Sequence, residues 1–390
     1  MRSMKRSDLA RRTVVFGVTI DYQLRYHEGL YERLVDDGWD VHVVSSPGPR
    51  LTRAGELKGV TAHSLVTNRQ PSPTADLRSL MAWYRVLRGI RPGVVVIGTP
   101  KAGLLGLVAA LVARVPHRVY ELHGLRFETA HGPSRWLLLA MEWVACTAAT
   151  QVVAVGESVQ SRATGARLVP RRKVRVLGAG SPNGVDIMHF KEARKDEAAR
   201  RMLRAQLGIG ESQSVVVFVG RLTRDKGLET LARALKRVSR VRRDVCALLV
   251  GGIDDSSGEV GLSHLREAVS SCVHVGEVAD PAPYLAIADV MCLPSYREGL
   301  PTVVLEAFAA GVPVVATAAT GIVDLVTAGV TGRLAPIDDD VALAAAITEL
   351  LDDPAEAAML ARSGGELVAT EFAAATVQRR WAAYLNSLAR

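Results

Sequence analysis

Short apolar runs rich in β-branched residues alternate with longer amphipathic stretches along nearly the whole chain. The runs lack strict polar–apolar alternation, which is typical of parallel strands buried on both faces. In the first half, strands are predicted at Thr13–Val18, Asp40–Ser45, Gly93–Ile97, Arg118–Glu121, Gln151–Val155 and Val174–Leu177. Helices are predicted between them at Glu28–Asp37, Ala75–Gly89, Ala102–Ala113, Ser134–Ala149 and Ser158–Ala166.

The second half repeats this pattern. Its predicted strands are Ser214–Val219, Cys246–Val250, Val273–Val275, Val290–Leu293 and Val312–Ala316, and its predicted helices are Leu228–Val238, Val260–Ser270, Thr302–Ala310 and Val341–Leu351. Two arrays of alternating strands and helices predict an α/β protein with two Rossmann-like, doubly wound parallel-sheet domains. The glycine-rich segment Gly178–Gly184 is the strongest break between them, so we place one domain at residues 1–180 and the next from residue 181.

Composition narrows the class of protein. With 390 residues, 48% hydrophobic and 23% charged, the chain fits a soluble two-domain enzyme. Its four cysteines have no metal-ligand spacing and are expected to be reduced and buried, which indicates a cytoplasmic protein. No apolar stretch predicts a membrane span, because Leu104–Val115 is too short and Trp136–Val155 carries Glu142 and Gln151.

The net charge of +8 is partly concentrated at the start of the chain, in Arg2, Lys5, Arg6, Arg11 and Arg12. A second basic cluster comprises Arg171, Arg172, Lys173 and Arg175. Such clusters either meet an anionic surface or are solvated. We expect no nucleic-acid partner, and peripheral contact with the inner face of a membrane stays open.

One glycine motif is misleading. Gly178-Ala179-Gly180 follows a predicted strand, but the dinucleotide fingerprint G-x-G-x-x-G requires a third glycine where Asn183 stands. Pro182 also interrupts the expected helix start. The segment is therefore interpreted as an interdomain turn and not as a cofactor site.

An acidic loop follows the predicted strand Val290–Leu293. Glu298 and Gly299 lie on this loop, Pro301 suits the first turn of the next helix, and Gly311 suits its end. Open α/β sheets bind ligands at the carboxyl ends of their strands, where helix N-termini attract anions. Glu306 lies on an otherwise apolar helix, so its carboxylate needs a partner, either ribose hydroxyls or a neighbouring arginine.

A basic loop follows the predicted strand Ser214–Val219. Arg221 and Lys226 flank this short loop, and Gly227 permits close approach of a ligand. A diphosphate requires such a cluster, and the same cations stabilise charge on a departing nucleoside diphosphate. The alternative is that Arg221, Arg224 and Lys226 are simply solvated.

Taken together, these segments resemble the retaining glycosyltransferases of the GT-B fold, in particular the large GT4 family. The resemblance rests on Gly220-Arg221-Leu222 with Lys226-Gly227, and on an E-x7-E motif formed by Glu298 and Glu306. The segment Pro294–Pro301 matches the family's signature around the first of these glutamates. Further matches are Asn183–Asp186, Thr331–Leu334, Gly98–Gly103 and His123–Arg126, the last two being similar to the capsule and surface-polysaccharide branch. One departure is Thr19–Tyr22, where many members carry paired glycines.

The resemblance implies two domains that face each other across a cleft, and a role for each matching residue. Gly220, Arg221 and Lys226 would bind the donor diphosphate, and Glu306 would bind the ribose. Glu298 and His123 would be the catalytic residues. Glu298, with Gly299, Leu300, Pro301 and Thr302, would contact the donor sugar, and His123 would approach it from the N-terminal domain. Val278 would lie beside the base. The second domain would extend over residues 181–370, and residues 371–390 would form a helix that crosses back to the first domain.

The chemistry implied is hexosyl transfer from a nucleoside-diphosphate sugar, a UDP-sugar rather than a GDP-sugar, with retention of anomeric configuration and no metal or other cofactor. The acceptor would be a glycan or a polyprenyl-linked saccharide in surface polysaccharide synthesis. Asp338-Asp339-Asp340 contains a D-x-D that binds metal in other nucleotide-sugar enzymes, but it precedes a predicted helix and is interpreted as a helix cap.

Three alternatives remain open at this point. A glycoside hydrolase also uses paired carboxylates but has no need of the Arg221/Lys226 loop. A nucleotide-sugar epimerase would need no acceptor, and a binding subunit would lack turnover. Binding of UDP or GDP separates the hydrolase from the others, and incubation with donor alone identifies the epimerase.

Overall fold

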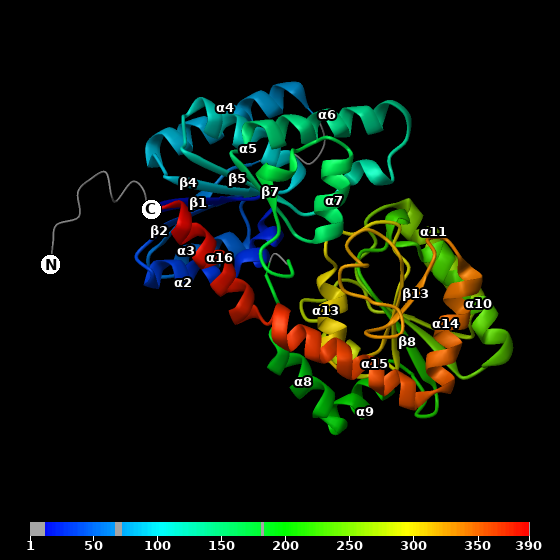
Figure 1. The fold of residues 1–390 in the computed structure, drawn as a ribbon. Coiled ribbons are helices and arrows are strands. Elements are labelled where there is room, and N and C mark those ends of the chain that lie inside the picture. Colours follow the sequence, from blue (N-terminus) through cyan, green and yellow to red (C-terminus); the bar gives the residue numbers. More distant parts are fainter. Residues whose placement is uncertain (1–11, 67–71, 181–182, 390) are drawn as a thin grey trace. The chain divides into compact units, whose positions relative to one another are not determined.

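The computed structural model describes residues 12–66, 72–180 and 183–389 (Figure 1). Arg2, Lys5, Arg6 and Arg11 of the basic N-terminal cluster lie outside the described residues. The chain divides into two compact units with a boundary after Asn183. The N-terminal unit also includes the segment from Ala374 onward, and the C-terminal unit is Gly184–Ala373.

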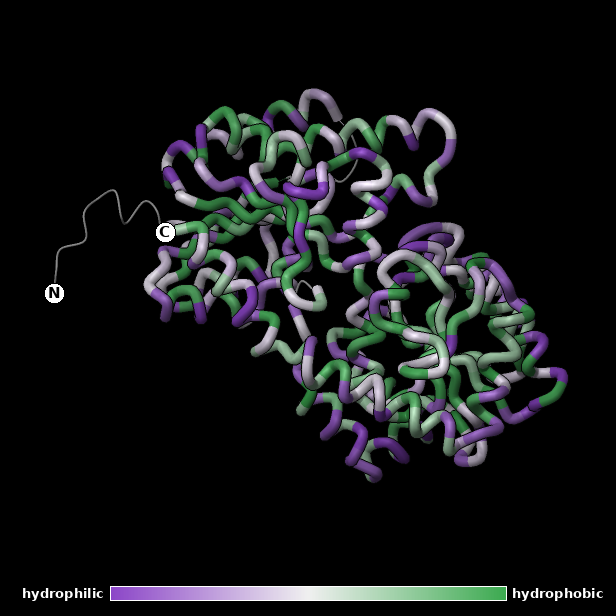
Figure 2. Tube along the Cα trace, viewed as in Figure 1, coloured by the Kyte–Doolittle hydropathy of each residue, from purple (hydrophilic) through white to green (hydrophobic). Residues whose placement is uncertain are grey.

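The N-terminal unit is built on a seven-stranded parallel sheet with the order β3-β2-β1-β4-β5-β6-β7. Its strands are β1 (Thr13–Gly17), β2 (Asp40–Ser45), β3 (Val60–Ser64), β4 (Val94–Gly98), β5 (His117–Leu122), β6 (Gln151–Ala154) and β7 (Val174–Arg175). The central strands β1 and β4 are buried along their whole length, and hydrophobic residues run along the strands of this sheet (Figure 2). Burial on both faces explains why these runs show no alternation.

Helices cover both faces of this sheet. In Figure 1, α4, α5 and α6 lie over one face, and α2, α3 and α16 lie over the other. The helical elements are η1 (Asp21–His27), α2 (Leu30–Asp36), α3 (Pro49–Glu56), α4 (Pro73–Ile90), α5 (Pro100–Val112), η2 (Arg126–Glu128), α6 (Gly132–Ala148), α7 (Glu157–Gly165), η3 (Arg171–Lys173) and α16 (Ala374–Leu388). The single helix predicted at Glu28–Asp37 is wrong at its start, because Gly29 has a φ of 77° and α2 begins only at Leu30.

The C-terminal unit repeats the plan with a six-stranded parallel sheet in the order β10-β9-β8-β11-β12-β13. Its strands are β8 (Ser214–Val219), β9 (Val245–Val250), β10 (Ser271–His274), β11 (Val290–Leu293), β12 (Val314–Thr317) and β13 (Arg333–Ala335). The helical elements are α8 (Ile187–Lys195), α9 (Glu197–Gln206), η4 (Arg224–Lys226), α10 (Leu228–Val241), α11 (Ser256–Ala268), α12 (Ala282–Ala286), α13 (Thr302–Ala309), α14 (Asp340–Asp352), α15 (Pro354–Leu367) and η5 (Val368–Phe372). Both sheets confirm the predicted pair of doubly wound parallel-sheet domains.

The strand order reverses once in each sheet, between β1 and β4 and between β8 and β11. At such a switch point the loops leave two neighbouring strands in opposite directions and open a crevice at their carboxyl ends. In the C-terminal unit these are the loops at residues 220–227 and 294–301. The topology therefore places the predicted basic loop and the predicted acidic loop side by side.

The C-terminal helix α16 completes the core of the N-terminal unit. Trp381 is almost fully buried, and its indole makes a T-shaped contact with the His27 ring at 5.9 Å between centroids. The Tyr384 hydroxyl donates to Gln151 Oε1 at 2.6 Å, and Trp39 Nε1 donates to Asn386 Oδ1 at 2.9 Å. These contacts explain why the last helix carries aromatic residues on one face.

Candidate active site

The loop after β8 is shaped by glycines. Gly227 has a φ of 70°, and a Cβ at this position would lie only 2.0 Å from the carbonyl oxygen of Pro294 in the loop after β11. Similarly, a Cβ at Gly251 would lie 1.9 Å from the Gly220 carbonyl oxygen. The amide of Tyr296 also donates to Asp225 O at 2.9 Å. Glycine at residue 227 is thus required for the basic and acidic loops to touch.

Lys226 and Glu298 meet where these loops touch. Lys226 Nζ donates to Glu298 Oε1 at 2.6 Å, and the two side chains are only 18% and 11% exposed. The Ser295 hydroxyl donates to the same carboxylate oxygen at 2.7 Å. The alternative that Lys226 is simply solvated is therefore wrong, because its ammonium contacts the Glu298 carboxylate. An ammonium has three donors, so it can contact Glu298 and a second anion together.

The backbone of the acidic loop is fixed from the far side by the loop after β12. The Glu298 amide donates to Thr320 O at 3.1 Å. Gly321 has a φ of 81°, and a Cβ there would lie 2.1 Å from the Gly299 carbonyl oxygen. Leu300 is buried, whereas Thr302 is half-buried at the start of α13. A loop held on both sides keeps its side chains in place before a ligand binds.

Arg221 differs from Lys226. Its guanidinium is 63% exposed and forms an ion pair with Asp254, not with Glu298. The Asp254 amide in turn donates to Leu222 O at 3.2 Å, which ties the β8 loop to the loop after β9. Arg221 therefore projects from the same loop as Lys226 and keeps most of its surface in solvent. An exposed pair of this kind is weak, so an anionic ligand can displace Asp254 at little cost.

The second glutamate of the motif lies on helix α13. This helix begins at Thr302, as predicted, and Pro301 is its N-cap, one residue before the first turn in which it was expected. Glu306 is only 9% exposed, and Gly311 ends the helix with a φ of 69°, as predicted. Val278 is half-buried in the loop after β10, which ends at His274 rather than at the predicted Val275.

His123 lies in the N-terminal unit, directly after β5. Its imidazole stacks on the Tyr26 ring with 4.8 Å between centroids and is 16% exposed. Its Nε2 lies 3.3 Å from Glu121 Oε2, and a Cβ at Gly98 on the neighbouring strand would lie 2.5 Å from that nitrogen. The inner nitrogen thus faces a carboxylate, and only the outer edge of the ring meets solvent.

Glu121 is completely buried and contacts two imidazoles, since His27 Nε2 also lies 3.0 Å from Glu121 Oε2. Both imidazoles lie within ion-pair distance of the carboxylate, but neither forms a well-aligned hydrogen bond with it. Burial by itself would raise the pKa of Glu121, but the imidazoles of His123 and His27 outweigh it and hold this pKa well below its usual range. The buried carboxylate is therefore ionised at neutral pH.

Thr19 stands where many members of the family carry paired glycines. Its hydroxyl forms hydrogen bonds with residues on the other side of the switch point. Thr19 Oγ1 lies 2.7 Å from Thr99 Oγ1, and it accepts a hydrogen bond from the Ala102 amide at 3.2 Å. One free amide at the start of α5 is thereby satisfied by the protein itself. This end of the N-terminal sheet is less open to an anion than a glycine loop would be.

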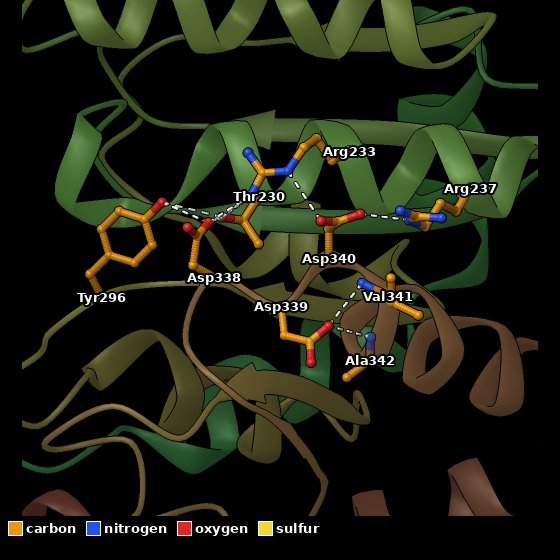
Figure 3. Close-up of polar contacts among 9 residues, drawn as sticks. All are labelled: Thr230, Arg233, Arg237, Tyr296, Asp338, Asp339, Asp340, Val341 and Ala342. Carbon is orange, nitrogen blue, oxygen red and sulfur yellow. Dashed lines mark hydrogen bonds and ion pairs between the residues drawn. The ribbon is translucent and has the colours of Figure 1, made fainter.

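The carboxylates of Asp338, Asp339 and Asp340 all contact other groups of the protein (Figure 3). Asp339 caps α14 by accepting from the amides of Val341 and Ala342, so the predicted helix cap is confirmed. Its neighbours form ion pairs with arginines of α10: Asp338 with Arg233, and Asp340 with Arg233 and Arg237. The Thr230 and Tyr296 hydroxyls also contact Asp338. These carboxylates hold α14 against α10.

Several residues of these sites escaped the sequence analysis. Asp254 carries no motif that distinguishes it from other polar loop residues, and Ser295 lies inside the matched segment Pro294–Pro301 but was given no role of its own. Glu121 does leave a signal, since it is a charged residue between the apolar strand residues Tyr120 and Leu122 and two positions before His123. Its second partner, His27, is separated from it by most of the domain and could not be identified.

Two family models match the chain: a glycosyl transferases group 1 model over residues 199–366 and a glycosyl transferase 4-like domain over residues 24–180. The chain is 30% identical to the capsular polysaccharide biosynthesis glycosyltransferase CapM of Staphylococcus aureus over 358 residues, 91% of this chain and 92% of that protein. It is 26% identical to the UDP-Gal:alpha-D-GlcNAc-diphosphoundecaprenol alpha-1,3-galactosyltransferase of Escherichia coli, with 83% of each chain covered.

Solved structures with this fold include HepE of Anabaena in complex with UDP-glucose. The TM-score is 0.78 at 22% identity, and the match covers 96% of this chain and 99% of that one. WaaG, a glycosyltransferase involved in lipopolysaccharide biosynthesis, matches with a TM-score of 0.73 at 15% identity over 95% and 99% of the two chains. The predicted GT-B class, with two Rossmann-like domains, is confirmed by these neighbours and by the two parallel sheets.

Proposed function

The chain belongs to the group 1 glycosyltransferases, and we propose that it moves a hexosyl group from a UDP-sugar to a glycan or polyprenyl-linked saccharide during surface polysaccharide synthesis. The observation that carries the proposal is the contact of Lys226 with Glu298 at the switch point of the C-terminal sheet. A cation and a carboxylate at one crevice suit a ligand that carries both a diphosphate and a hydroxyl-rich ring.

The positions of the side chains support a role for each in this proposal. Lys226 binds the diphosphate while keeping one donor on Glu298, because an ammonium has donors to spare. Arg221 turns from Asp254 to the same diphosphate, with Gly220 allowing close approach. Negative charge that develops on the departing nucleoside diphosphate is stabilised by these two cations, so no metal is invoked for this step.

The donor sugar lies against the acidic loop. Glu298 accepts hydrogen bonds from sugar hydroxyls, and the backbone from Gly299 to Thr302 shapes the wall beside it. Glu306 accepts from the ribose hydroxyls, and Val278 lies beside the base. His123 of the N-terminal unit donates to the sugar from its outer nitrogen, and the product keeps the anomeric configuration.

Support for the choice of donor and acceptor comes from relatives. HepE structures contain UDP and UDP-glucose, and the Escherichia coli relative is named for UDP-Gal and a GlcNAc-diphosphoundecaprenol. CapM is named for capsular polysaccharide biosynthesis. The diphosphate-binding loop and these relatives favour a transferase over a hydrolase or an epimerase.

The test is a panel of nucleoside diphosphates and sugar nucleotides, screened first for thermal stabilisation and then for product by mass spectrometry. We expect UDP and UDP-hexoses to stabilise the protein and one UDP-hexose to yield a glycosylated acceptor. Stabilisation by UDP should be reduced in Lys226→Met and retained in the control Lys236→Met, an exposed lysine of α10. A protein that ignores every nucleotide, or converts the donor without an acceptor, is not the transferase proposed.

A further inference from the structure

The outer face of α6 is unusually apolar for a helix on a protein surface. Trp136 is 70% exposed, Leu137 is 56% exposed and Trp143 is 54% exposed. Helices of globular proteins normally present polar residues to water and keep such side chains for the core. The neighbouring helix α5 adds exposed Leu111 and Val112 at its C-terminal end.

The exposed charge on α6 is positive only. Its only charged residues are Arg135 and Glu142. Glu142 is buried and accepts a hydrogen bond from the Tyr120 hydroxyl at 2.8 Å, and burial raises the pKa of its carboxyl to about 7. The exposed surface of this helix therefore has one cation and no acidic side chain.

A basic hollow adjoins the C-terminal part of α6. It has a volume of about 680 Å³, and Trp143 and Thr147 of α6 form part of its wall. Its charged lining residues are all cations: Arg167, Arg172, Lys173 and Arg175. No acidic residue lines the hollow, and among the described residues none of these four forms an ion pair with a carboxylate.

Several arginines of the C-terminal unit, in contrast, form ion pairs with carboxylates. Arg233, Arg242 and Arg333 each pair with at least one acidic residue. In the hollow, Lys173 instead donates to the Thr147 carbonyl, and the Arg175 guanidinium lies over the Tyr384 ring. Within the part of the chain that the structure describes, the positive charge there has no acidic partner, so it is available to an external anion.

We infer that the α6 docking surface, made of Trp136, Leu137, Trp143, Arg167, Arg172 and Lys173, binds the face of an anionic phospholipid bilayer. Tryptophans lie at the boundary between headgroups and acyl chains, where their apolar ring and polar edge are both satisfied. Lysines and arginines beside them bind lipid phosphates. Apolar rings bordered by unpaired cations match these two layers of a bilayer.

The position of α6 in the fold gives this contact a purpose. The helix begins nine residues after His123, at the carboxyl ends of the strands, and ends at their amino ends, beside the hollow. A bilayer that lies along α6 therefore reaches the carboxyl ends of the strands, where His123 lies. Delivery of a lipid-linked acceptor rests on the proposed function, whereas binding of the bilayer does not. No helix among the described residues is both long and apolar enough to cross a membrane, so the inferred contact is peripheral.

The experiment is flotation of the full chain with vesicles of phosphatidylcholine alone or with phosphatidylglycerol added. Each cation near an anionic leaflet strengthens binding about five-fold, so Arg167→Asn/Arg172→Gln/Lys173→Gln should weaken it about a hundred-fold. Trp136→Ser/Trp143→Ser should weaken it by about ten-fold or more. The wild type should float only with the anionic vesicles, and added salt should release it.

Matched controls remove similar groups from the C-terminal unit. Lys236→Gln/Arg240→Gln/Arg243→Gln removes three exposed cations from α10 and the segment after it, and Met188→Ser/Met202→Ser removes two exposed apolar side chains. Both controls should float as the wild type does. UDP stabilisation and the thermal transition, measured without vesicles, should be unchanged in all four variants.

Three results would overturn the inference. One is equal flotation with neutral and anionic vesicles, another is equal loss of binding in the control variants, and the third is loss of self-association in the tryptophan variant, which would make the surface an interface between two copies. Since flotation requires no nucleotide, a failure here is separate from a failure of the proposed transfer reaction.

Discussion

The buried contact of Glu121 with His27 and His123 gives a stability prediction that can be worked through in detail. Glu121 is fully buried, and both imidazole Nε2 atoms lie within 3.3 Å of its Oε2. Glu121→Gln keeps the shape of the side chain and removes its charge. Losing one partner of a buried ion pair costs about 3–5 kcal/mol, and we expect a loss in this range for Glu121→Gln.

The pH dependence has a definite sign. The folded-state pKa of Glu121 is lowered relative to the unfolded chain, so the stability it contributes is present above the unfolded value of about 4.3. That contribution is lost as the pH falls through the folded-state pKa. The difference between wild type and Glu121→Gln should be largest near neutral pH and should shrink in acid.

The assay is urea unfolding of both proteins at a series of pH values, following the transition of the N-terminal unit. Glu56→Gln is the matched control, because Glu56 lies on α3 in the same unit, is exposed and undergoes the same change of charge. Its free energy of unfolding should stay within about 0.5 kcal/mol of wild type. A Glu121→Gln protein equal to wild type, or a difference that grows in acid, would refute the reasoning.

Two further predictions concern the C-terminal unit. Asp339→Ala should lower the free energy of unfolding by about 1 kcal/mol, because Asp339 caps α14, and Asp339→Asn should recover most of this loss in the same denaturation assay. Gly227→Ala should weaken UDP stabilisation and lower the melting temperature, because its Cβ would meet the Pro294 carbonyl and its φ is 70°, whereas Gly208→Ala, also at positive φ but with open space around it, should leave UDP stabilisation unchanged.

Much of the fold could be predicted from the apolar runs. Asp40–Ser45, Ser214–Val219 and Val290–Leu293 are strands with the predicted bounds. The last two are nearly continuous apolar runs, the signal that burial on both faces leaves. Strands β3 and β13 were missed because they lie at the sheet edges. β3 is mostly polar and only partly buried, and β13 has three residues.

The candidate site could be predicted only one loop at a time. The strand–turn–helix pattern marked the loops that carry Lys226 and Glu298, and the switch point explains why they adjoin. The contact between the two side chains spans 72 positions and depends on Gly227 approaching Pro294, which no local pattern specifies. The pairing of Arg221 with Asp254 escaped for the same reason.

The central claim is that Lys226 and Glu298 bind the same UDP-sugar. UDP affinity and transfer rate should therefore be measured together in Lys226→Met and Glu298→Gln. We expect Lys226→Met to weaken UDP binding about ten-fold to a hundred-fold, the value of a charge-assisted hydrogen bond. Glu298→Gln should bind UDP at least as well as wild type, because its loss frees the ammonium, yet transfer about a hundred-fold more slowly or worse. Wild-type transfer rates in both variants would contradict the account.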